Sequence, residues 1–363
     1  MSTNLSDLLK VCAGCGSCLS SCPVYLTLRD ETYSPRGKIA VIQAMEEGRI
    51  PPVEGAPVLS YCSLCGGCES VCPNGIRTLD IFAEARSRWG RSLLKKALVA
   101  GFARGIFPAH LFTSLGALFF PEKLPFRPSL KPFLSRAEEF YPGAGRGRVL
   151  LFVGCLTNRF FPNHAEAAVR VLSHSGYDVL VPKGQICCGF PYLSLGEKEE
   201  FRKIMAHNRR IIDSLKPDFI TSTCPTGMTT LRRFYGYENV RDLASLVLQG
   251  KGNFNKIPLR TAWHDPCHLK KELGIWSQPR ELLSSLSSFK EMERPELCCG
   301  FGGSFSLSHP EISFSLRKEK RKYIKESGAE VLITACPGCI MFLGSFSPVP
   351  SLHLSEFLLR AMK

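Results

Sequence analysis

The residues of this chain that are best suited to chemistry are its cysteines, of which there are 17 among 363 residues. Two runs of them repeat one pattern, C-x2-C-x2-C-x3-C-P. Thiolates at such short intervals can surround one metal centre, and the glycines between them let the loop turn closely around it. The first run contains Cys12, Cys15, Cys18 and Cys22, and the second contains Cys62, Cys65, Cys68 and Cys72.

Each run resembles the cluster-binding run of two-cluster bacterial ferredoxins, where three cysteines bind one [4Fe-4S] cluster and the fourth binds the other. The resemblance implies two clusters whose ligands cross between the runs. Zinc and disulfides are the alternatives, but two identical runs that end in C-P favour iron-sulfur clusters. The implied ligand sets are Cys12, Cys15, Cys18 and Cys72 for one cluster, and Cys62, Cys65, Cys68 and Cys22 for the other.

A second cysteine pattern occurs twice in the rest of the chain, about a hundred residues apart. The first copy reads C-x31-C-C-G-x34-C, and the second differs from it by one residue in each spacer, which indicates a tandem duplication. Only the second copy ends in C-x2-C, because Gly227 stands where the first would have its fifth cysteine. The copies contain Cys155, Cys187, Cys188 and Cys224, and Cys267, Cys298, Cys299, Cys336 and Cys339.

The two copies therefore lead to different expectations. Five thiols in the second copy predict a further iron-sulfur cluster. The first copy could hold an ordinary cluster, a smaller one, zinc or nothing, and its cysteines could also be small buried residues. Thr226 is its nearest oxygen donor, although a hydroxyl is a poorer ligand than a thiolate. His264 and His268, beside Cys267, could donate to cluster sulfurs or bind iron, or could be ordinary loop residues.

The elements that position these cysteines change in character along the chain. From Arg148 onward, strands and helices alternate: strands are predicted at 149–153, 178–181 and 219–223, and helices at 165–175 and 197–215. This alternation predicts an α/β fold with mostly parallel sheets, in which Cys155 and Cys224 follow strands. Ligands bind beyond the carboxyl ends of such strands.

The N-terminal region is predicted to be helical, with helices that begin at Ser34 and Pro35 and near Leu79 and that brace the two cysteine runs. The apolar stretch Leu93–Pro121 is interrupted by charged residues, so a helical hairpin is favoured over a helix in the membrane interface, and a membrane span is excluded. The predicted regions are a ferredoxin-like domain at 1–90, a helical and Pro-rich connector at 91–147, and cysteine-rich modules at 148–250 and 251–363.

Composition limits the cellular setting. The first ten residues contain no apolar signal segment, and an odd number of cysteines in metal-type patterns indicates a reducing compartment, so we expect a cytoplasmic protein. The formal charge of +14 comes from scattered basic residues, which does not indicate nucleic-acid binding. It is compatible with peripheral association at the inner face of a membrane.

Beyond these patterns, the C-C-G modules resemble the cysteine-rich domain of heterodisulfide reductase catalytic subunits. A two-cluster ferredoxin domain ahead of two such modules resembles the iron-sulfur subunits of glycolate oxidase, lactate-utilisation and anaerobic glycerol-3-phosphate dehydrogenase complexes, with the glycolate or lactate type fitting best. The further matching segments are S-P-R-G-K at 34–38, H-D-P-C-H at 264–268 and C-C-G-F-G-G-S-F at 298–305.

The resemblance implies an electron-transferring iron-sulfur subunit of a flavin-dependent 2-hydroxyacid dehydrogenase. The sequence has no flavin or nicotinamide motif, so FAD would belong to a partner oxidase subunit, and no residue is assigned to catalysis. Electrons would pass to a quinone or other acceptor, with a further iron-sulfur or membrane quinone-reactive subunit as a second partner. The alternatives are disulfide reduction at the second C-C-G cluster, as in heterodisulfide reductases, and a zinc-stabilised interaction module.

Overall fold

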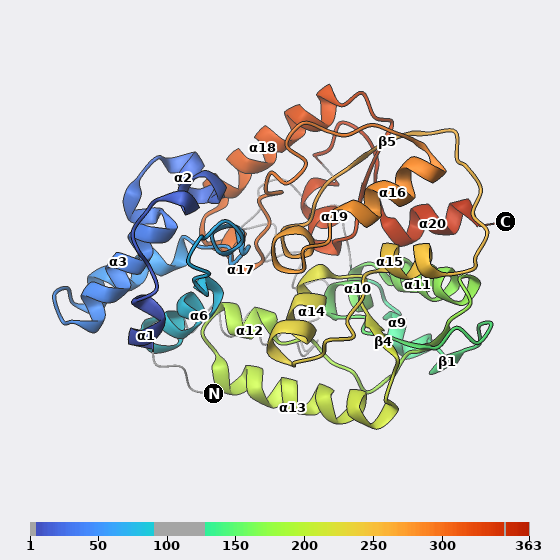
Figure 1. Cartoon of the computed structure of the whole chain (residues 1–363), viewed down its shortest axis with the longest axis horizontal. Coiled ribbons are helices and arrows are strands. Elements are labelled where there is room, and N and C mark those ends of the chain that lie inside the picture. Colours follow the sequence, from blue (N-terminus) through green and yellow to red (C-terminus); the bar gives the residue numbers. More distant parts are fainter. Residues whose placement is uncertain (1–4, 91–127, 345, 363) are drawn as a thin grey trace.

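A computed structural model describes residues 5–90, 128–344 and 346–362 of the chain. The hairpin predicted at Leu93–Pro121 lies outside these ranges, as does the start of the Pro-rich linker. The described parts form three regions (Figure 1): N-terminal helices at one end, a first α/β module below them and a second α/β module above.

The N-terminal region consists of helices and loops around the two cysteine runs. Both predicted helices are present, as α3 (Pro35–Glu46) and α6 (Thr78–Trp89). Ser34 caps α3, because its hydroxyl oxygen accepts a hydrogen bond from the Gly37 amide at 2.9 Å. The shorter elements are α1 (Leu5–Leu9), η1 (Ser17–Ser21), α2 (Pro23–Leu28), η2 (Glu31–Tyr33), α4 (Pro52–Gly55), η3 (Ala56–Ser60) and α5 (Gly67–Ser70).

The first module contains a four-stranded sheet in the order β1-β3-β2-β4, in which only the β1–β3 pair is antiparallel. Its strands are β1 (Phe140–Tyr141), β2 (Arg148–Leu151), β3 (Asp178–Leu180) and β4 (Phe219–Thr221). The last three match the predicted strands but end one or two residues earlier. Its helices are α9 (Phe133–Arg136), α10 (Cys155–Phe160), α11 (Pro162–His174), α12 (Phe190–Ser194), α13 (Lys198–Leu215), α14 (Pro225–Thr229), the π-helical turn η4 (Thr230–Phe234) and α15 (Leu243–Gln249).

The second module repeats this plan with a fully parallel sheet in the order β6-β5-β7-β8. Its strands are β5 (Arg260–Trp263), β6 (Ser288–Phe289), β7 (Val331–Thr334) and β8 (Ser351–His353). Its helices are the π-helical turn η5 (His268–Glu272), α16 (Ser277–Leu286), α17 (Ser304–Ser308), α18 (Pro310–Glu326), α19 (Pro337–Leu343) and α20 (Leu354–Ala361). Both modules therefore have small, mostly parallel sheets with helices, as the sequence predicted.

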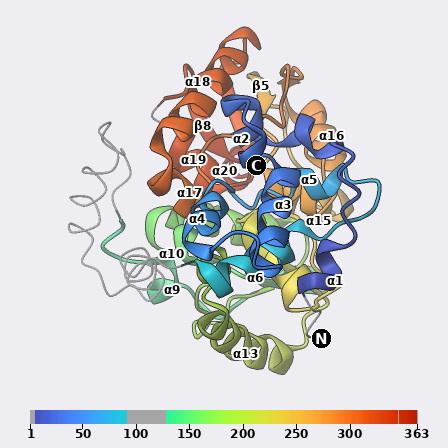
Figure 2. The same cartoon turned by 90° about the vertical axis from the view of Figure 1, so that its left-hand side faces the viewer.

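The three regions pack directly on one another. The N-terminal helices meet the second module where α2 contacts α18 (Figure 2). They also meet it where α5 contacts η5, and they meet the first module where α6 contacts α12. The modules meet each other through α14 and η5 and through α10 and α19. As a result, the loops that follow the strands of both modules face a shared interior.

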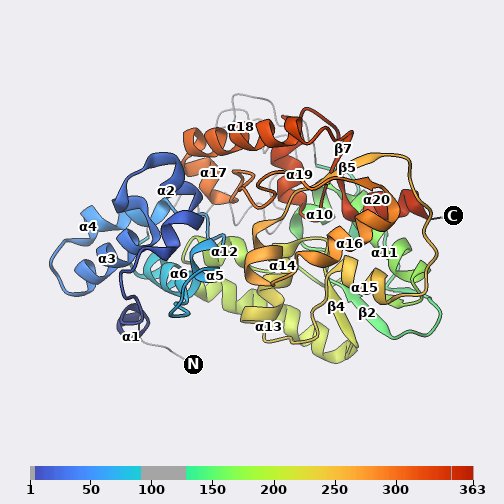
Figure 3. The same ribbon diagram turned by 45° about the horizontal axis from the view of Figure 1, so that its top comes forward.

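The C-terminal helix α20 joins the two modules, because it packs on α11 of the first (Figure 3). His353, at the start of α20, stacks on His164 of α11 with ring centroids 4.4 Å apart. Glu356 pairs with His164 at 3.2 Å. Burial alone would raise the pKa of Glu356, but the interaction with His164 and the hydrogen bond from the His353 backbone amide outweigh it, and that pKa is lowered to about 2. These contacts fix the relative position of the modules.

Within the described ranges, no helix combines the length and apolar character that crossing a membrane requires.

Candidate metal centres

The eight cysteines of the N-terminal runs line two small, adjoining cavities. One, the outer site, is lined by Cys12, Cys15, Cys18 and Cys72, and the other, the inner site, is lined by Cys22, Cys62, Cys65 and Cys68. These are the crossed sets that the ferredoxin resemblance implies. Cys68 also lines the outer cavity. That each set binds a cluster stays a prediction.

The inner site is the more enclosed of the two. Cys22 is buried, whereas Cys15 of the outer site is exposed. Burial raises the pKa of Cys22 to about 11, and it raises that of Cys68 well above its usual value, with neighbouring Cys62 and Cys65 adding to the effect. Neighbouring buried thiols resist ionisation, but they become thiolates when a cationic metal centre binds among them. This set of sulfur donors therefore fits an iron-sulfur cluster.

Two hydrogen bonds reach sulfur atoms of the inner site. The Leu64 amide donates to Cys62 Sγ at 3.4 Å, and the Thr78 hydroxyl lies 3.1 Å from Cys68 Sγ. Hydrogen bonds to cluster sulfurs are among the factors that set reduction potential. Sequence reasoning missed Thr78, since a threonine at the start of a helix looks like an ordinary helix end.

All cysteines of the two C-C-G modules except Cys187 line one central cavity of about 170 Å³. The sequence predicted two modules but not a shared cavity. Cys65 of the inner site also lines it, next to Cys267 and Cys298. The remaining cysteines in its wall are Cys155, Cys188 and Cys224 from the first module and Cys299, Cys336 and Cys339 from the second.

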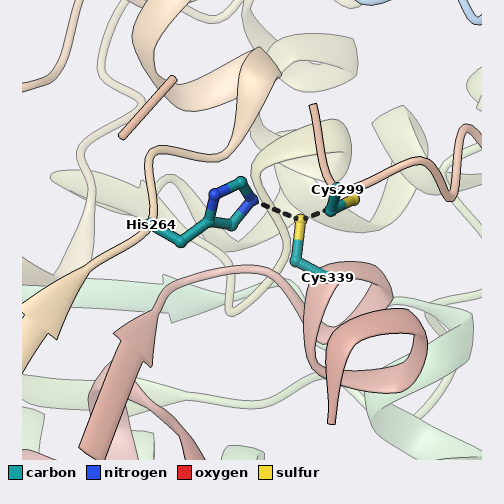
Figure 4. Close-up of side chains that lie close together, drawn as sticks. All are labelled: His264, Cys299 and Cys339. Atoms are coloured by element: carbon teal, nitrogen blue, oxygen red, sulfur yellow. Dashed lines mark hydrogen bonds between the residues drawn. The ribbon is translucent and has the colours of Figure 1, made fainter. Parts of the chain in front are cut away.

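In the second module, His264, Cys299 and Cys339 form a compact group whose ligand atoms all lie within 4.8 Å of one another (Figure 4). His264 Nε2 is 3.3 Å from Cys339 Sγ, which is 3.3 Å from Cys299 Sγ. His264 Nδ1 faces the Pro295 carbonyl at 3.2 Å, so Nδ1–H donates there and Nε2 keeps its lone pair toward the thiols. Burial lowers the pKa of His264, which favours this neutral form.

Both histidines line the central cavity, but among the described residues only His264 forms a hydrogen bond with a thiol, and both ring nitrogens of His268 bond elsewhere. Burial lowers the pKa of His268 to about 4, and the ring is therefore neutral. Its Nε2–H donates to the Leu64 carbonyl at 2.8 Å, and its Nδ1 accepts from the Thr226 hydroxyl at 2.8 Å. His268 thus connects the inner-site loop to the first module and fixes the Thr226 side chain.

The first module brings its cysteines together less completely. Cys187 Sγ lies 3.8 Å from Cys155 Sγ, and Thr226 joins Cys224 in the cavity wall. The Thr226 hydroxyl donates its hydrogen bond to His268 Nδ1, so only the lone pairs of its oxygen could bind a metal. Gly227, at the fifth-cysteine position, also lines the cavity.

All 17 cysteines are free thiols, including pairs whose sulfurs nearly touch. Burial raises the pKa values of Cys224 and Cys267 well above the usual value, and the thiols around each of them add to the rise. Converging unpaired thiols of this kind suit iron-sulfur clusters better than packing alone.

Comparison with known proteins agrees with this arrangement. The 4Fe-4S dicluster domain family matches residues 8–76, and the cysteine-rich CCG domain family matches residues 149–232 and 261–344. A solved structure, a hypothetical protein from Helicobacter pylori, superimposes with a TM-score of 0.57 and 12% identity over all of this chain and 73% of the other, which supports the fold alone.

Three curated relatives cover large parts of the chain. It is 27% identical to the probable glycolate oxidase iron-sulfur subunit of Bacillus subtilis, over 96% of this chain and 93% of that protein. It is 31% identical to lactate utilization protein A of Exiguobacterium, over 59% of this chain and 98% of that protein. It is 29% identical to a fumarate reductase (CoM/CoB) subunit of Methanothermobacter marburgensis, over 91% of this chain and 66% of that protein.

The cysteine sites and these matches define an iron-sulfur subunit of an oxidoreductase complex. The chain belongs to the family that joins a 4Fe-4S dicluster domain to tandem CCG domains, the family of the glycolate oxidase iron-sulfur subunits and lactate utilization protein A.

Proposed function

We propose that this chain transfers electrons from a partner FAD subunit of a 2-hydroxyacid dehydrogenase, of the glycolate or lactate type, to a quinone or other acceptor. The acceptor would be reached directly or through a further iron-sulfur or membrane quinone-reactive subunit. When bound, iron-sulfur clusters at the cysteine sites would supply single-electron transfer.

The observation that carries the proposal is the continuity of the cysteine sites. Cys68 lines both the outer and the inner cavity, and Cys65 lines both the inner and the central cavity. The three sites thus follow one another from the exposed Cys15 to the enclosed interior between the modules. Such an arrangement suits a subunit that conducts electrons over a distance.

The protein around these sites holds the ligand-bearing loop in place. Leu64 turns the inner-site loop with a φ of 53°, and its carbonyl is held by His268 of the second module. Glu69, beside Cys68, pairs with Arg233 of the first module at 2.6 Å, and Glu272 of η5 pairs with the same arginine at 2.9 Å. Both modules therefore fix the loop that lies between the inner site and the central cavity.

The test is anaerobic purification of the chain with its co-purifying partners, followed by rapid mixing with glycolate or with lactate. We expect flavin reduction first and bleaching of the iron-sulfur absorbance after it. A complex in which the flavin is reduced while the iron-sulfur absorbance stays unchanged would contradict the proposal.

A second function is favoured by the shared central cavity, because thiols of both modules face one space of about 170 Å³. This function is two-electron reduction of a small disulfide at the cluster of Cys267, Cys298, Cys299, Cys336 and Cys339. The name of the Methanothermobacter marburgensis relative, a fumarate reductase (CoM/CoB) subunit, agrees with it. Reoxidation of the dithionite-reduced protein by a small disulfide, but not by a quinone analogue, would favour this second function.

A further inference from the structure

The two basic side chains of the segment S-P-R-G-K at 34–38 lie at different cysteine sites. Ser34 caps α3, and Gly37 is required because a Cβ there would lie 1.9 Å from the Glu31 carbonyl oxygen. With the helix start fixed in this way, Arg36 lines the outer site and Lys38 lines the inner site. The segment therefore supplies one cation to each site.

The two cations differ in how their charge is balanced. Arg36 forms two hydrogen bonds with the Glu31 carboxylate, at 2.9 and 3.0 Å, and a third with the Gly14 carbonyl. Lys38 is 1% exposed, and its ammonium donates to the Tyr33 carbonyl. No carboxylate among the described residues forms an ion pair with Lys38.

A second cation beside the inner site has carbonyl groups as its partners. The Arg86 guanidinium is buried and donates to the carbonyl oxygens of Leu59, of Cys62 at 2.5 Å and of Ser194 at 2.7 Å. Carbonyl groups satisfy its hydrogen bonds but carry no net charge. An arginine stays protonated when buried, so its positive charge remains.

A third cation lies between the inner site and the central cavity. Lys271 Nζ approaches Gly67 so closely that a Cβ there would be 3.0 Å away. Burial alone would lower the pKa of Lys271, but the thiols of Cys65, Cys267 and Cys298 outweigh it and the pKa is raised. The Lys271 ammonium thus lies beside Gly67, which precedes Cys68 of the inner site, and it stays charged there.

Buried charges without counter-charges are costly. Lys38 and Arg86 are two such charges, and Lys271 is a third cation that is partly buried. A cluster bound by four thiolates is the negative group that would balance these cations. We propose that Lys38, Arg86 and Lys271 are the counter-charges of the inner-site cluster and give it a higher reduction potential than the outer-site cluster. This inference uses the cluster ligands of the proposed function but not its substrate or partner.

The physical reason is that reduction adds one negative charge to a cluster that its thiolates already make negative. Burial of the inner site opposes that added charge, whereas the three cations favour it. At the outer site, Glu31 cancels most of the Arg36 charge. An electron that arrives at the outer site from the partner's reduced flavin would therefore move inward, with no bond formed and no proton transferred.

The experiment is a redox titration of the anaerobically purified chain, followed by electron paramagnetic resonance. The two signals are assigned beforehand with Cys22→Ser, which should disturb the inner signal, and Cys15→Ser, which should disturb the outer one. Lys38→Met should shift the inner-site reduction equilibrium at least tenfold toward the oxidised form, or about 59 mV for one electron. Lys271→Met should shift it in the same direction.

Two matched variants control for structural effects. Lys38→Arg keeps the charge and should leave the inner potential close to the original, and Arg36→Gln should shift only the outer signal, by less. Iron and sulfide content must be unchanged in each variant. The inference is overturned if Lys38→Met leaves the inner potential unmoved at full iron content, or if the outer site has the higher potential in the unmodified chain. Neither result depends on whether a 2-hydroxy acid is the electron source.

Discussion

The two C-C-G modules have the same plan but differ at two positions that face each other. In the second module His264 precedes Cys267 by three residues, and Cys339 closes the C-x2-C pair. The corresponding residues of the first module are Phe152 and Gly227. A Cβ at Gly227 would lie 3.9 Å from the Phe152 ring, so the same pair of positions is in contact in both modules.

The difference is therefore one coordinated change rather than a single lost cysteine. A histidine and a thiol, both able to approach a metal, are replaced by a phenyl ring and a hydrogen atom. We infer that the fifth cysteine and the histidine act together, since their ligand atoms lie within 4.8 Å of one another. The coordinated change also explains why the first module remains well packed without them, since Phe152 is fully buried.

The modules also differ in buried charge beside these positions. Asp265 follows His264, and its carboxylate accepts hydrogen bonds from Arg280, Lys270 and the Trp263 indole. The equivalent Val153 has an apolar side chain, and its backbone amide donates to the Gln185 side-chain oxygen at 2.7 Å. The second module thus uses a charged network to hold the loop that carries its histidine.

The largest expected effect is a difference in activity between substitutions at the C-C-G cysteines of the two modules. Cys299→Ser should lower electron transfer to the acceptor by more than about a hundredfold, because Cys299 belongs to the complete thiol set. Cys188→Ser should be milder, and flavin reduction in the partner should persist in both variants. Stopped-flow measurement of flavin and acceptor reduction provides the test. Inactive Cys188 variants beside normal Cys299 variants would reverse the roles of the modules.

The next effect concerns stability. Asp265→Ala should destabilise the protein by about 3–5 kcal/mol, because it leaves the Arg280 and Lys270 charges without their buried partner. Glu291→Ala is the matched control, since Glu291 pairs with the same arginine but is 46% exposed, and it should cost less than about 1 kcal/mol. Denaturant unfolding under anaerobic conditions measures both. An equal loss of unfolding free energy in the two variants would show that the buried network does not stabilise the protein more than the exposed ion pair does.

Restoring the histidine and the fifth cysteine to the first module would test directly whether these two residues act together in metal binding. The double variant Phe152→His with Gly227→Cys should bind more iron per chain than the unmodified protein, because it restores both missing donors to the first module. Gly227→Cys alone should bind less than the double variant. Iron and sulfide analysis after anaerobic reconstitution measures the difference. If the two variants bind equal iron, the histidine contributes nothing to binding.

The smallest expected effect concerns the joint between the modules. Burial, with a smaller contribution from His164, lowers the pKa of His353 to about 3, so the folded state holds it neutral while the unfolded state titrates near 6.5. The unfolded state therefore binds more protons, and the stabilisation present above pH 6.5 is lost as the pH falls toward 3. Between pH 7.5 and 5.5 this loss should be about 1.4 kcal/mol.

His353→Asn provides the comparison for that measurement, because asparagine can cap α20 without titrating in this range. Melting temperatures at the two pH values should differ less for the variant than for the unmodified chain. An unchanged pH dependence would assign the acid sensitivity to groups other than His353.

Much of this organisation could be predicted from the sequence because it depends on local patterns. The C-x2-C-x2-C-x3-C-P runs have a spacing that few other sites use, and strand and helix alternation follows from the periodicity of apolar residues. The start of α3 at Ser34 and Pro35 is likewise set by neighbouring residues. These features need no knowledge of how distant segments meet.

The tertiary structure decided what depends on contacts between distant segments. Only folding places Cys65 beside Cys267 and brings cysteines of both C-C-G modules to one cavity. Folding also places His264 beside the Cys339 thiol and His268 beside the Leu64 carbonyl, although both histidines are near Cys267 in the sequence. Lys38 and Arg36 look equivalent in the sequence, and only the position of Glu31 shows that one charge is balanced and the other is not. The physical reason is that charge balance and metal ligation act through space, over a few ångströms, between residues that the chain connects only through its fold.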